Sequence, residues 1–411
     1  PKGTARDYPL FPNRGFMLDV ARKFCTMDYL KQYVKILSFY KMNEFQIHLN
    51  DNGFPQFFGD DWNRTYAAFR LESERFPGLT AKDGSYSKQE FIDLQRMGLE
   101  YGVRIIPEID IPAHSLAFAH YKPEIASRKY GMDHLDLYKK ETYQFVDSLL
   151  DEYLSGDNPV FIGDLHIGTD EYNKKEAEQY RYFTDRYLKF VEKYGKNVRM
   201  WGGLKWLPGK TPVKAEGVTV NAWSYDWVDP VVSLQDGYKL INTCDTYLYI
   251  VPAAGYYRDF LDHQWIYEKW SPWIMNRKQT LPEGTPGVLG GMFAVWNDKC
   301  GNGISEQDVH LRSFPAMQVL AEKLWKGENK NVTYEAFAKL CKTTPEAPGI
   351  NLLGKVPAET ALTEAGKELS FNGKEAVSTP LQEVGYPYSV EFQLCPEKTN
   401  PISSILFQGP H

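Results

Sequence analysis

The sequence predicts an α/β protein whose main domain is a (β/α)8 barrel, the TIM-barrel architecture. Eight short runs of β-branched and apolar residues alternate with segments that carry the apolar spacing of amphipathic helices, over roughly 330 of the 411 residues. The remaining length is enough for a smaller module after the barrel. The alternative for this element order is a doubly wound parallel sheet, but no G-x-G-x-x-G phosphate loop follows the first strand candidate.

The eight strand candidates are short, and polar or aromatic residues stand at or just after their C-terminal ends. In chain order the candidates are Gly15–Val20, Glu44–Leu49, Val103–Ile109, Leu165–Gly168, Val198–Trp201, Thr219–Trp223, Lys239–Asn242 and Gly290–Val295. In a barrel the C-terminal ends of all strands face one side, so these trailing residues are expected to meet at a single mouth.

Four helices are expected from apolar stripes and end signals. Thr26 is placed to cap the first helix, Ser87 and Glu90 form a capping-box pattern before the second, and Gly102 and Gly195 stand where helices close. The four apolar stripes are Leu30/Tyr33/Val34/Leu37, a run that opens after Ser87, Phe145/Leu149/Leu150/Tyr153 and Tyr180/Phe183/Tyr187/Val191.

The composition changes after about residue 342, which divides the chain into three expected parts. Residues 1–342 are predicted to form the barrel domain, and 343–357 a linker rich in Pro, Gly and Thr. Residues 358–411 show strand-like alternation, as in Tyr388–Phe392, and are predicted to begin a β-rich accessory module that the chain does not complete. The segment Leu406–Pro410 is read either as a native strand or as an engineered protease-cleavage site.

Composition argues against several classes of protein. A net charge of −6 disfavours a nucleic-acid surface, and the absence of a run of about 18 apolar residues disfavours a membrane span. Five cysteines without C-x-x-C spacing disfavour a disulfide framework or a zinc knuckle. The chain has 10 Trp, 27 Tyr and 23 Phe, and aromatic rings line sugar-binding clefts as well as cores.

The motif His166-Ile167-Gly168-Thr169-Asp170-Glu171 ends the fourth strand candidate with two consecutive carboxylates. Where a strand ends the backbone turns, so both side chains can reach the mouth. Two close carboxyls cannot both ionise freely, and a division into one acid and one anion suits glycosidic cleavage. The structural alternative is that Asp170 and Glu171 only cap the following helix.

Polar and aromatic residues at the other strand ends favour the catalytic interpretation of this motif over the capping one. Each residue alone has a structural explanation, but their joint placement at the predicted mouth is hard to obtain by chance. These residues are Asp19, His48-Leu49-Asn50-Asp51, Glu108, Asp110, His114-Ser115, Trp201, Trp223, Tyr247 and Trp296-Asn297-Asp298.

Together these motifs resemble the family-20 glycoside hydrolases, which include β-N-acetylhexosaminidases and lacto-N-biosidases. The resemblance covers roughly residues 7–325 and rests on four ordered motifs, Arg14–Arg22, His48–Asp51, Pro107–Ser115 and His166–Glu171. It implies a retaining enzyme in which the 2-acetamido group of the substrate replaces an enzyme nucleophile, an exception among glycosidases.

The resemblance also implies a role for each candidate residue. Glu171 is expected to be the general acid and base, Asp170 to orient the acetamido group, and Tyr247 to donate to its carbonyl oxygen. Arg14 is expected to bind the 3- and 4-hydroxyls, and Asp51 and His114 to hold Glu171. The remaining residues expected to bind substrate are His48, His166, Trp201, Trp223, Tyr249, Trp296 and Asp298.

Some positions depart from the family pattern. Thr169 replaces a usual Gly, Gly202 and Gly203 follow Trp201 where acids are common, and Tyr249 and Asp298 stand where Asp and Glu are usual. Since the resemblance assigns such positions to the 4- and 6-hydroxyls, it leaves the sugar preference open. A roomier site near C6 admits a sulfated sugar, with Lys205 or Lys299 nearby in sequence.

The resulting expectation is a hydrolase that removes terminal β-linked GlcNAc or GalNAc from a glycan, without metal or other cofactor. The alternatives are a lacto-N-biosidase-type enzyme, a 6-sulfo-GlcNAc-specific enzyme, a metal-dependent hydrolase using His48, His114 and His166, and a non-catalytic glycan-binding protein. The family resemblance implies a secreted, periplasmic or cell-surface location, although the chain shows no signal peptide.

Overall fold

The computed structural model describes residues 4, 6–355, 362, 369–371, 377–379, 389–391 and 393. Compactness divides the chain into two units, 1–351 and 352–411. Only the first unit contains described helices and strands, so the predicted β-rich segment 358–411 lies almost entirely outside the described residues. None of the described helices is long and apolar enough to cross a membrane.

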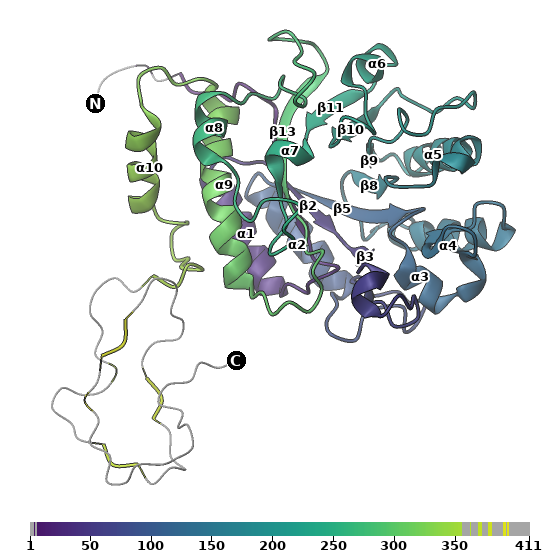
Figure 1. Cartoon of the computed structure of the whole chain (residues 1–411), viewed down its shortest axis with the longest axis horizontal. Helices are drawn as coiled ribbons and strands as arrows, with labels where there is room; N and C mark the ends of the chain where they lie inside the picture. Colours follow the sequence, from purple (N-terminus) through teal and green to yellow (C-terminus); the bar gives the residue numbers. More distant parts are fainter. Residues whose placement is uncertain are drawn as a thin grey trace. The chain divides into compact units, whose positions relative to one another are not determined.

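The first unit is a closed parallel barrel of eight strands, which confirms the predicted fold (Figure 1). The strands run in the order β1-β2-β5-β8-β9-β10-β11-β13, and β13 pairs with β1 to close the sheet. Their bounds are β1 (Asn13–Asp19), β2 (Glu44–His48), β5 (Arg104–Ile111), β8 (Leu165–Gly168), β9 (Val198–Trp201), β10 (Val218–Ala222), β11 (Lys239–Asn242) and β13 (Val288–Val295).

Helices between the strands form the outer layer of the barrel (Figure 1). The expected caps are present, because Thr26 accepts from Tyr29 N and Ser87 and Glu90 form a reciprocal capping box. The helices are α1 (Met27–Phe39), α2 (Lys88–Glu100), α3 (Leu116–Tyr121), α4 (Lys140–Leu154), α5 (Ala177–Glu192), α6 (Pro230–Gln235), α7 (Asp245–Leu248), α8 (His263–Glu268), α9 (Glu306–Lys326) and α10 (Tyr334–Thr343).

Short elements extend the loops at the C-terminal side of the strands. β3 (Asn50–Asn52) pairs with β4 (Ala67–Phe69), and β6 (Ala126–Ser127) pairs with β7 (Gly131–Leu135). β12 (Tyr249–Ile250) adds to the end of β13. The single-turn 3-10 helices are η1 (Pro55–Phe58), η2 (Pro123–Ile125) and η3 (Lys174–Glu176).

A buried ion network fills the N-terminal end of the barrel, opposite the mouth. The Arg199 guanidinium binds both oxygens of Glu44, at 2.6 and 2.8 Å, and also lies 2.8 Å from Asp164 Oδ2. Burial opposes ionisation of Glu44, but the charge and hydrogen bonds of Arg199 lower its pKa. Removing one partner of a buried ion pair leaves an unpaired charge in the protein interior, which is strongly destabilising. The network therefore holds the N-terminal ends of these strands together.

Candidate active site

The loop after β8 turns sharply and aims two adjacent acids in different directions. Gly168, Thr169 and Glu171 have φ angles of 66°, 78° and 51°, in the left-handed region that non-glycine residues rarely adopt. A Cβ on Gly168 would lie 1.7 Å from Asp110 Oδ1, so only glycine lets the two strands approach. Tyr180 on α5 fixes the turn by donating to the Thr169 carbonyl.

His114 links Glu171 to a buried carboxylate and lies close to both adjacent acids. Its Nδ1 is 2.9 Å from Asp51 Oδ1, and its Nε2 is 3.3 Å from Glu171 Oε2 and 3.7 Å from Asp170 Oδ2. Burial lowers the pKa of His114, but the charges of Asp51 and Asp170 outweigh it and raise the pKa well above its ordinary value. The structure therefore brings Asp51, His114 and Glu171 together in the predicted order.

Arg22, which follows β1, joins three strand ends at the mouth. Its guanidinium contacts Asp51 at 2.8 Å and both Asp19 and Asp298 at 3.1 Å, while its Nε donates to the Asn52 carbonyl at 2.9 Å. A guanidinium has five N–H donors in a planar fork, enough for three carboxylates and a carbonyl at once, whereas an ammonium has only three. Arg22 therefore holds Asp51, the partner of His114, in a fixed position relative to Asp298.

The prediction that Arg14 binds the sugar hydroxyls is wrong in its placement. Arg14 lies near the start of β1, at the N-terminal end of the barrel, where it donates to the carbonyls of Lys41 and Phe11 and lies over the ring of Trp325. The motif contains two arginines, and the sequence argument chose the first. The mouth faces the C-terminal ends of the strands, so only Arg22 can reach it.

Asp170 is paired with a third carboxyl, that of Asp110 at the end of β5. Burial and the charge of Asp170 raise the pKa of Asp110 well above its ordinary value, so Asp110 keeps its proton. Burial also raises the pKa of Asp170, to about 6, although a hydrogen bond from Asp110 favours the anion. At neutral pH Asp170 is therefore an anion beside a protonated partner.

Of the two adjacent acids, Asp170 and not Glu171 has the raised pKa, through burial and in part through the charge of Glu171, so the predicted division into one carboxyl pushed towards protonation and one anion holds in direction. Burial favours neutral Glu171, but the hydrogen bond from His114 and the charges of His114 and Arg22 outweigh it, so the pKa of Glu171 is lowered. The resting Glu171 therefore shares a proton with cationic His114 rather than holding it alone.

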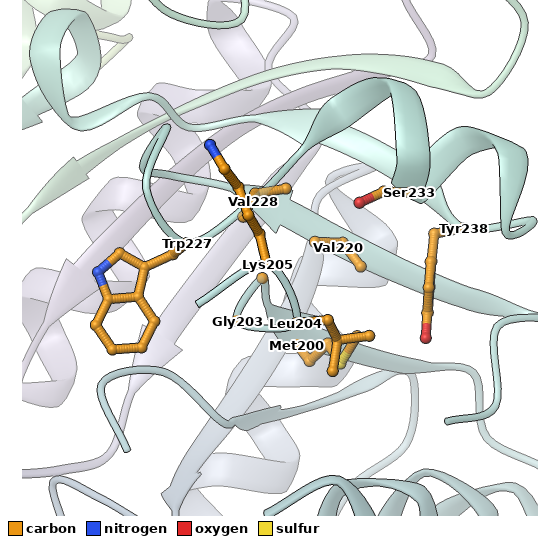
Figure 2. Close-up of a pocket in the computed structure, with 10 residues that line it drawn as sticks. Met200, Gly203, Leu204, Lys205, Val220, Trp227, Val228, Ser233 and Tyr238 are labelled. Atoms are coloured by element: carbon orange, nitrogen blue, oxygen red, sulfur yellow. The ribbon is translucent and has the colours of Figure 1, made fainter. Parts of the chain in front are cut away.

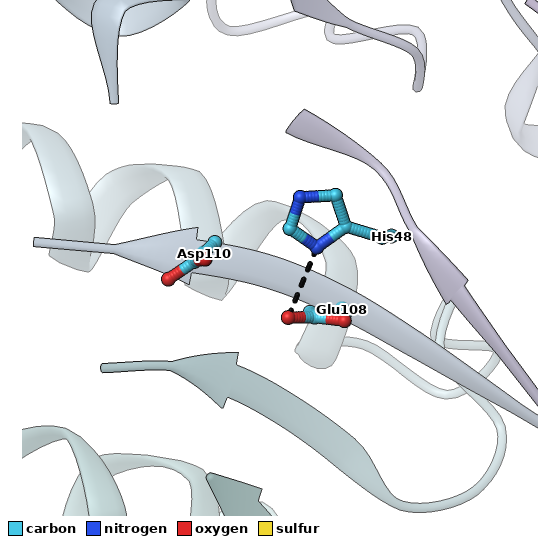
Figure 3. Close-up of side chains that lie close together, drawn as sticks. All are labelled: His48, Glu108 and Asp110. Carbon is cyan, nitrogen blue, oxygen red and sulfur yellow. Dashed lines mark ion pairs between the residues drawn. The ribbon is translucent and has the colours of Figure 1, made fainter. Parts of the chain in front are cut away.

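Glu108 contacts both His48, which is a partner of Asp51, and the indole of Trp201. Its Oε1 accepts from Trp201 Nε1 at 2.5 Å and lies 3.0 Å from His48 Nδ1, a contact drawn in Figure 3. The other His48 nitrogen, Nε2, lies 2.7 Å from Asp51 Oδ2. His166 is also near, with Nδ1 3.6 Å from Glu108. His48 and His166 are fully buried, so they support the site from below rather than contact solvent.

Two of the predicted tryptophans, Trp201 and Trp296, pack together beside the buried groups His48 and Glu108. Trp296 packs 5.6 Å from Trp201 and 4.9 Å from His48, and the rings are buried or nearly so. Trp223 is 7% exposed and donates from Nε1 to the Gly202 carbonyl. These indoles give the site an apolar wall that suits a sugar face or an acetyl methyl.

The two candidate tyrosines after β11 have different surroundings. Tyr247 stacks on Trp265 at 4.4 Å, and no contact in the described part of the chain joins it to Asp170 or Glu171. Tyr249 is buried beside Trp296, with ring centres 5.8 Å apart, and burial and the nearby charge of Asp170 help to raise its pKa well above the ordinary value. Tyr249 is therefore better placed than Tyr247 to meet an acetamido group.

Steric crowding explains why glycine stands at positions 202 and 203, directly after Trp201. A Cβ on Gly202 would lie 2.1 Å from Val228 Cγ2, and one on Gly203 would lie 2.6 Å from the Tyr180 hydroxyl. The same two glycines, together with Lys205 and Trp227, line a cavity of about 20 Å³ (Figure 2). It has room for a water molecule but not for a sugar, so it is not itself the site that holds the substrate.

Among the residues that the structure describes, two groups of side chains bring ligand-type atoms close enough for a cation. One is His48, Glu108 and Asp110 (Figure 3), and the other is Asp110, His114 and Asp170, each with its atoms within 4.8 Å. In the first, both His48 nitrogens already face carboxylates. In the second, Asp51 takes one His114 nitrogen. Hydrogen bonds between these histidines and carboxylates therefore explain why the groups lie close together, as expected for perturbed titratable residues at a barrel mouth.

Sequence reasoning assigned no role to Arg22, Glu108 or Asp110, which the structure places at the centre of the site. The signal was present for two of them, because Glu108 and Asp110 are two residues apart in one strand and so share its inner face. For Arg22 the signal was its place after the strand end, where loop residues reach the mouth.

A (β/α)8 barrel with a histidine-linked acid and a neighbouring carboxylate at its mouth defines the class of barrel glycoside hydrolases. Within this class, residues 11–328 match the family described as "Glycosyl hydrolase family 20, catalytic domain". The chain therefore belongs to glycosyl hydrolase family 20, as its motifs predicted.

Curated relatives agree with this family. The chain is 27% identical over 382 residues to β-hexosaminidase subunit B2 of Dictyostelium discoideum, covering 81% of this chain and 60% of that protein. It is 28% identical over 262 residues to a β-hexosaminidase of Akkermansia muciniphila, covering 54% and 50%. The chain thus spans only 50% to 60% of the length of these two relatives.

Solved structures share the fold. The β-N-acetylhexosaminidase from Bacteroides fragilis superposes with a TM-score of 0.64 at 22% identity, covering 82% of this chain and 70% of that one. Dispersin B superposes with a TM-score of 0.59 at 20% identity, covering 76% and 99%. At these identities the likeness establishes the architecture.

Proposed function

We propose that this chain removes terminal β-linked N-acetylhexosamine from glycans with retention of configuration, using the substrate's acetamido group as nucleophile. One observation carries the proposal: the adjacent acids have different neighbours, Glu171 lying 3.3 Å from His114 Nε2 and Asp170 lying beside Asp110, whose pKa burial raises well above its ordinary value. The first can pass a proton, and the second stays anionic to receive a cationic intermediate. The names of the curated relatives support the choice of sugar.

In the first step Glu171 gives the proton that it shares with His114 to the leaving glycosidic oxygen. As the bond from C1 to that oxygen breaks, the acetamido carbonyl oxygen bonds to C1 and forms an oxazolinium ion. Asp170 accepts the N–H of the acetamido group, which orients the carbonyl and balances its charge. Tyr249, the better-placed tyrosine, donates to the carbonyl oxygen while Trp201 and Trp296 exclude water.

In the second step Glu171, now an anion, takes a proton from water. The oxygen of that water attacks C1, the ring of the intermediate opens, and the acetamido group is restored. His114 and Asp51 hold the carboxyl of Glu171 in place through both steps, because their contacts do not involve the substrate. Two inversions at C1 give net retention.

The disaccharide-releasing and 6-sulfo-GlcNAc alternatives stay open. A residue that grips the 3-hydroxyl would exclude a sugar extended at that position, but Arg14, which was expected to bind this hydroxyl, lies at the other end of the barrel. Arg22 is largely occupied by Asp19, Asp51 and Asp298, so its grip on a sugar is limited. A secreted, periplasmic or cell-surface location is likewise a proposal, and it rests on the family resemblance.

A panel of nitrophenyl glycosides tests the proposal. We expect release from β-GlcNAc or β-GalNAc glycosides and none from the β-glucoside, which lacks the acetamido group. Glu171→Gln should abolish cleavage of unactivated oligosaccharides, while Asp157→Asn, at an exposed acid outside the four motifs, serves as the folding-matched control. Lacto-N-biose and 6-sulfo-GlcNAc glycosides decide between the alternatives, and activity after EDTA dialysis excludes the metal-dependent one. Cleavage of the glucoside at an equal rate would overturn the proposal.

A further inference from the structure

Three indoles lead outward from the candidate site along the rim of the barrel. Trp223 packs 5.5 Å from Trp227, and Trp227 packs 5.2 Å from Trp206, with interplanar angles of 31° and 33°. Trp223 is nearly buried, whereas Trp206 is 36% exposed. We call Trp223, Trp227 and Trp206 the indole shelf. Such a graded series of flat rings suits the C–H faces of a bound saccharide.

The indole shelf lies on the side of the site from which the leaving sugar must depart. Lys174 is three residues after Glu171 in the same loop, and its Nζ lies 4.6 Å from the centre of the Trp206 ring. Because Glu171 protonates the leaving oxygen, the loop that carries it borders the leaving part of the substrate. Trp206 and Lys174 therefore border that part too, beyond the pocket for the terminal sugar.

The shelf is flanked by cations that have no carboxylate partner. Lys205 and Lys278 lie over the ring of Tyr225, at 3.4 and 4.3 Å, and Lys205 also donates to the Tyr225 carbonyl. In the described part of the chain, none of Lys174, Lys205 and Lys278 forms an ion pair. This is unusual beside a site rich in acids, in a chain with a net charge of −6.

The acids of the same loops are mostly occupied by their own neighbours. Glu176 accepts from Lys129 and two tyrosine hydroxyls, Glu178 accepts from the backbone at Lys210 and Thr211, and Asp229 caps α6. Asp226 is the exception, because it is exposed next to Tyr225 and no contact of the described residues occupies it. The balance of available charge around the shelf is therefore positive.

We propose that the indole shelf is a binding site for the sugar next to the scissile bond and that it selects a sugar bearing an anionic group. This inference rests on the proposed function. The ring face of that sugar stacks on Trp206 and Trp227, and a sulfate or carboxylate on it pairs with Lys174 or with the Lys205–Lys278 pair. Asp226 opposes the same anion and so tunes the selection.

The test compares kcat/KM for four substrates with a terminal β-GlcNAc. One is the glycosyl azide, which has no second sugar, and the others join GlcNAc to galactose, to 6-sulfogalactose or to glucuronic acid. We expect the wild-type chain to prefer an anionic disaccharide over the neutral one at low salt. The preference should shrink at high salt, since exposed charges are screened. A response to sulfate alone, to carboxylate alone or to both identifies the anion, and each supports the proposal.

Variants assign the effect to residues. Trp206→Ala should lower the ratio of disaccharide to azide kcat/KM by about tenfold. Lys174→Gln should lower the anionic-to-neutral ratio by about tenfold, Asp226→Asn should raise it, and Lys175→Gln, the adjacent exposed lysine, is the matched control. If the azide is cleaved but neither ratio changes in the variants, the shelf proposal is wrong and the proposed function stands. If no substrate is cleaved, the proposed function itself fails.

Discussion

Asp170 and Glu171 are neighbours in the chain, yet the Asp170 side chain is 11% exposed and that of Glu171 is 49% exposed. The left-handed backbone at Glu171 produces this separation, because it turns one carboxyl toward Asp110 and leaves the other at the mouth beside His114. The roles that we propose for the two acids follow from these surroundings and not from their residue types.

Asp170→Asn should lower kcat by roughly two to four orders of magnitude, since an amide cannot balance the charge of the intermediate. The same change should stabilise the fold at pH 7 by about 1–3 kcal/mol. The folded pKa of Asp170 is about 6, above its ordinary value, so ionisation between pH 4 and pH 6 costs the folded protein stability. Denaturant unfolding at pH 4 and pH 7 checks this, and equal differences at both values would contradict it.

The pH profile of kcat/KM should rise through about pH 6, because Asp170 acts as an anion and its pKa is raised to about 6 by burial. Asp110→Ala removes the hydrogen bond that favours this anion and should move the acidic limb to higher pH. Asp110→Asn keeps a donor and serves as the control. An acidic limb near pH 4 in the wild type, or one that both variants leave in place, would refute the assignment.

Arg22→Lys and Arg14→Lys form a matched pair that tests the placement of the two arginines. Arg22→Lys should lower kcat/KM at least a hundredfold, because three buried carboxylates lose a guanidinium that contacts them together. Arg14→Lys should cost about 1–2 kcal/mol of stability and change kcat/KM less than twofold, since its contacts are backbone carbonyls and Trp325. The reverse pattern in kinetics and melting would restore the original prediction for Arg14.

Tyr249→Phe and Tyr247→Phe separate the two tyrosine candidates. Removing the buried hydroxyl of Tyr249 should lower kcat about tenfold to a hundredfold with little change in fold, as expected for one lost donor to a developing charge. Tyr247→Phe keeps the ring that stacks on Trp265 and should change kcat less than threefold. Steady-state kinetics on a nitrophenyl GlcNAc glycoside reads both effects, and a larger loss for Tyr247→Phe would return the role to that residue.

The barrel was predictable because its signals are local. β8, β9 and β11 have the bounds expected from short apolar runs, and the Thr26 and Ser87 caps start helices where the sequence placed them. Helix capping and strand alternation depend on residues that are close in the sequence, so a single sequence is enough to predict them. The added elements in the mouth loops, such as β3 and β4, pair residues across a longer connection and left no such signal.

The sequence predicted which acids and which histidine meet at the mouth, but it did not predict the correct arginine or the proton on Asp110. Asp51, His114 and Glu171 meet as expected, because strand ends share one side of the barrel. The choice of Arg14 over Arg22 was wrong because it followed the family resemblance and not the predicted strand Gly15–Val20, which already placed Arg14 before the strand and Arg22 after its end. The proton on Asp110 depends on burial and on the neighbouring charge of Asp170, and neither can be read from a linear sequence.

The most direct test of the proposed mechanism changes the nucleophilicity of the substrate's acetamido group. Nitrophenyl β-GlcNAc glycosides with zero, one, two or three fluorines on the N-acetyl methyl have progressively weaker carbonyl nucleophiles but nearly the same shape. If the acetamido oxygen attacks C1 with Asp170 holding its N–H, log kcat/KM should fall steeply and linearly with fluorination. A flat series in an active wild-type enzyme would contradict the account, because the nucleophile would then be some other group.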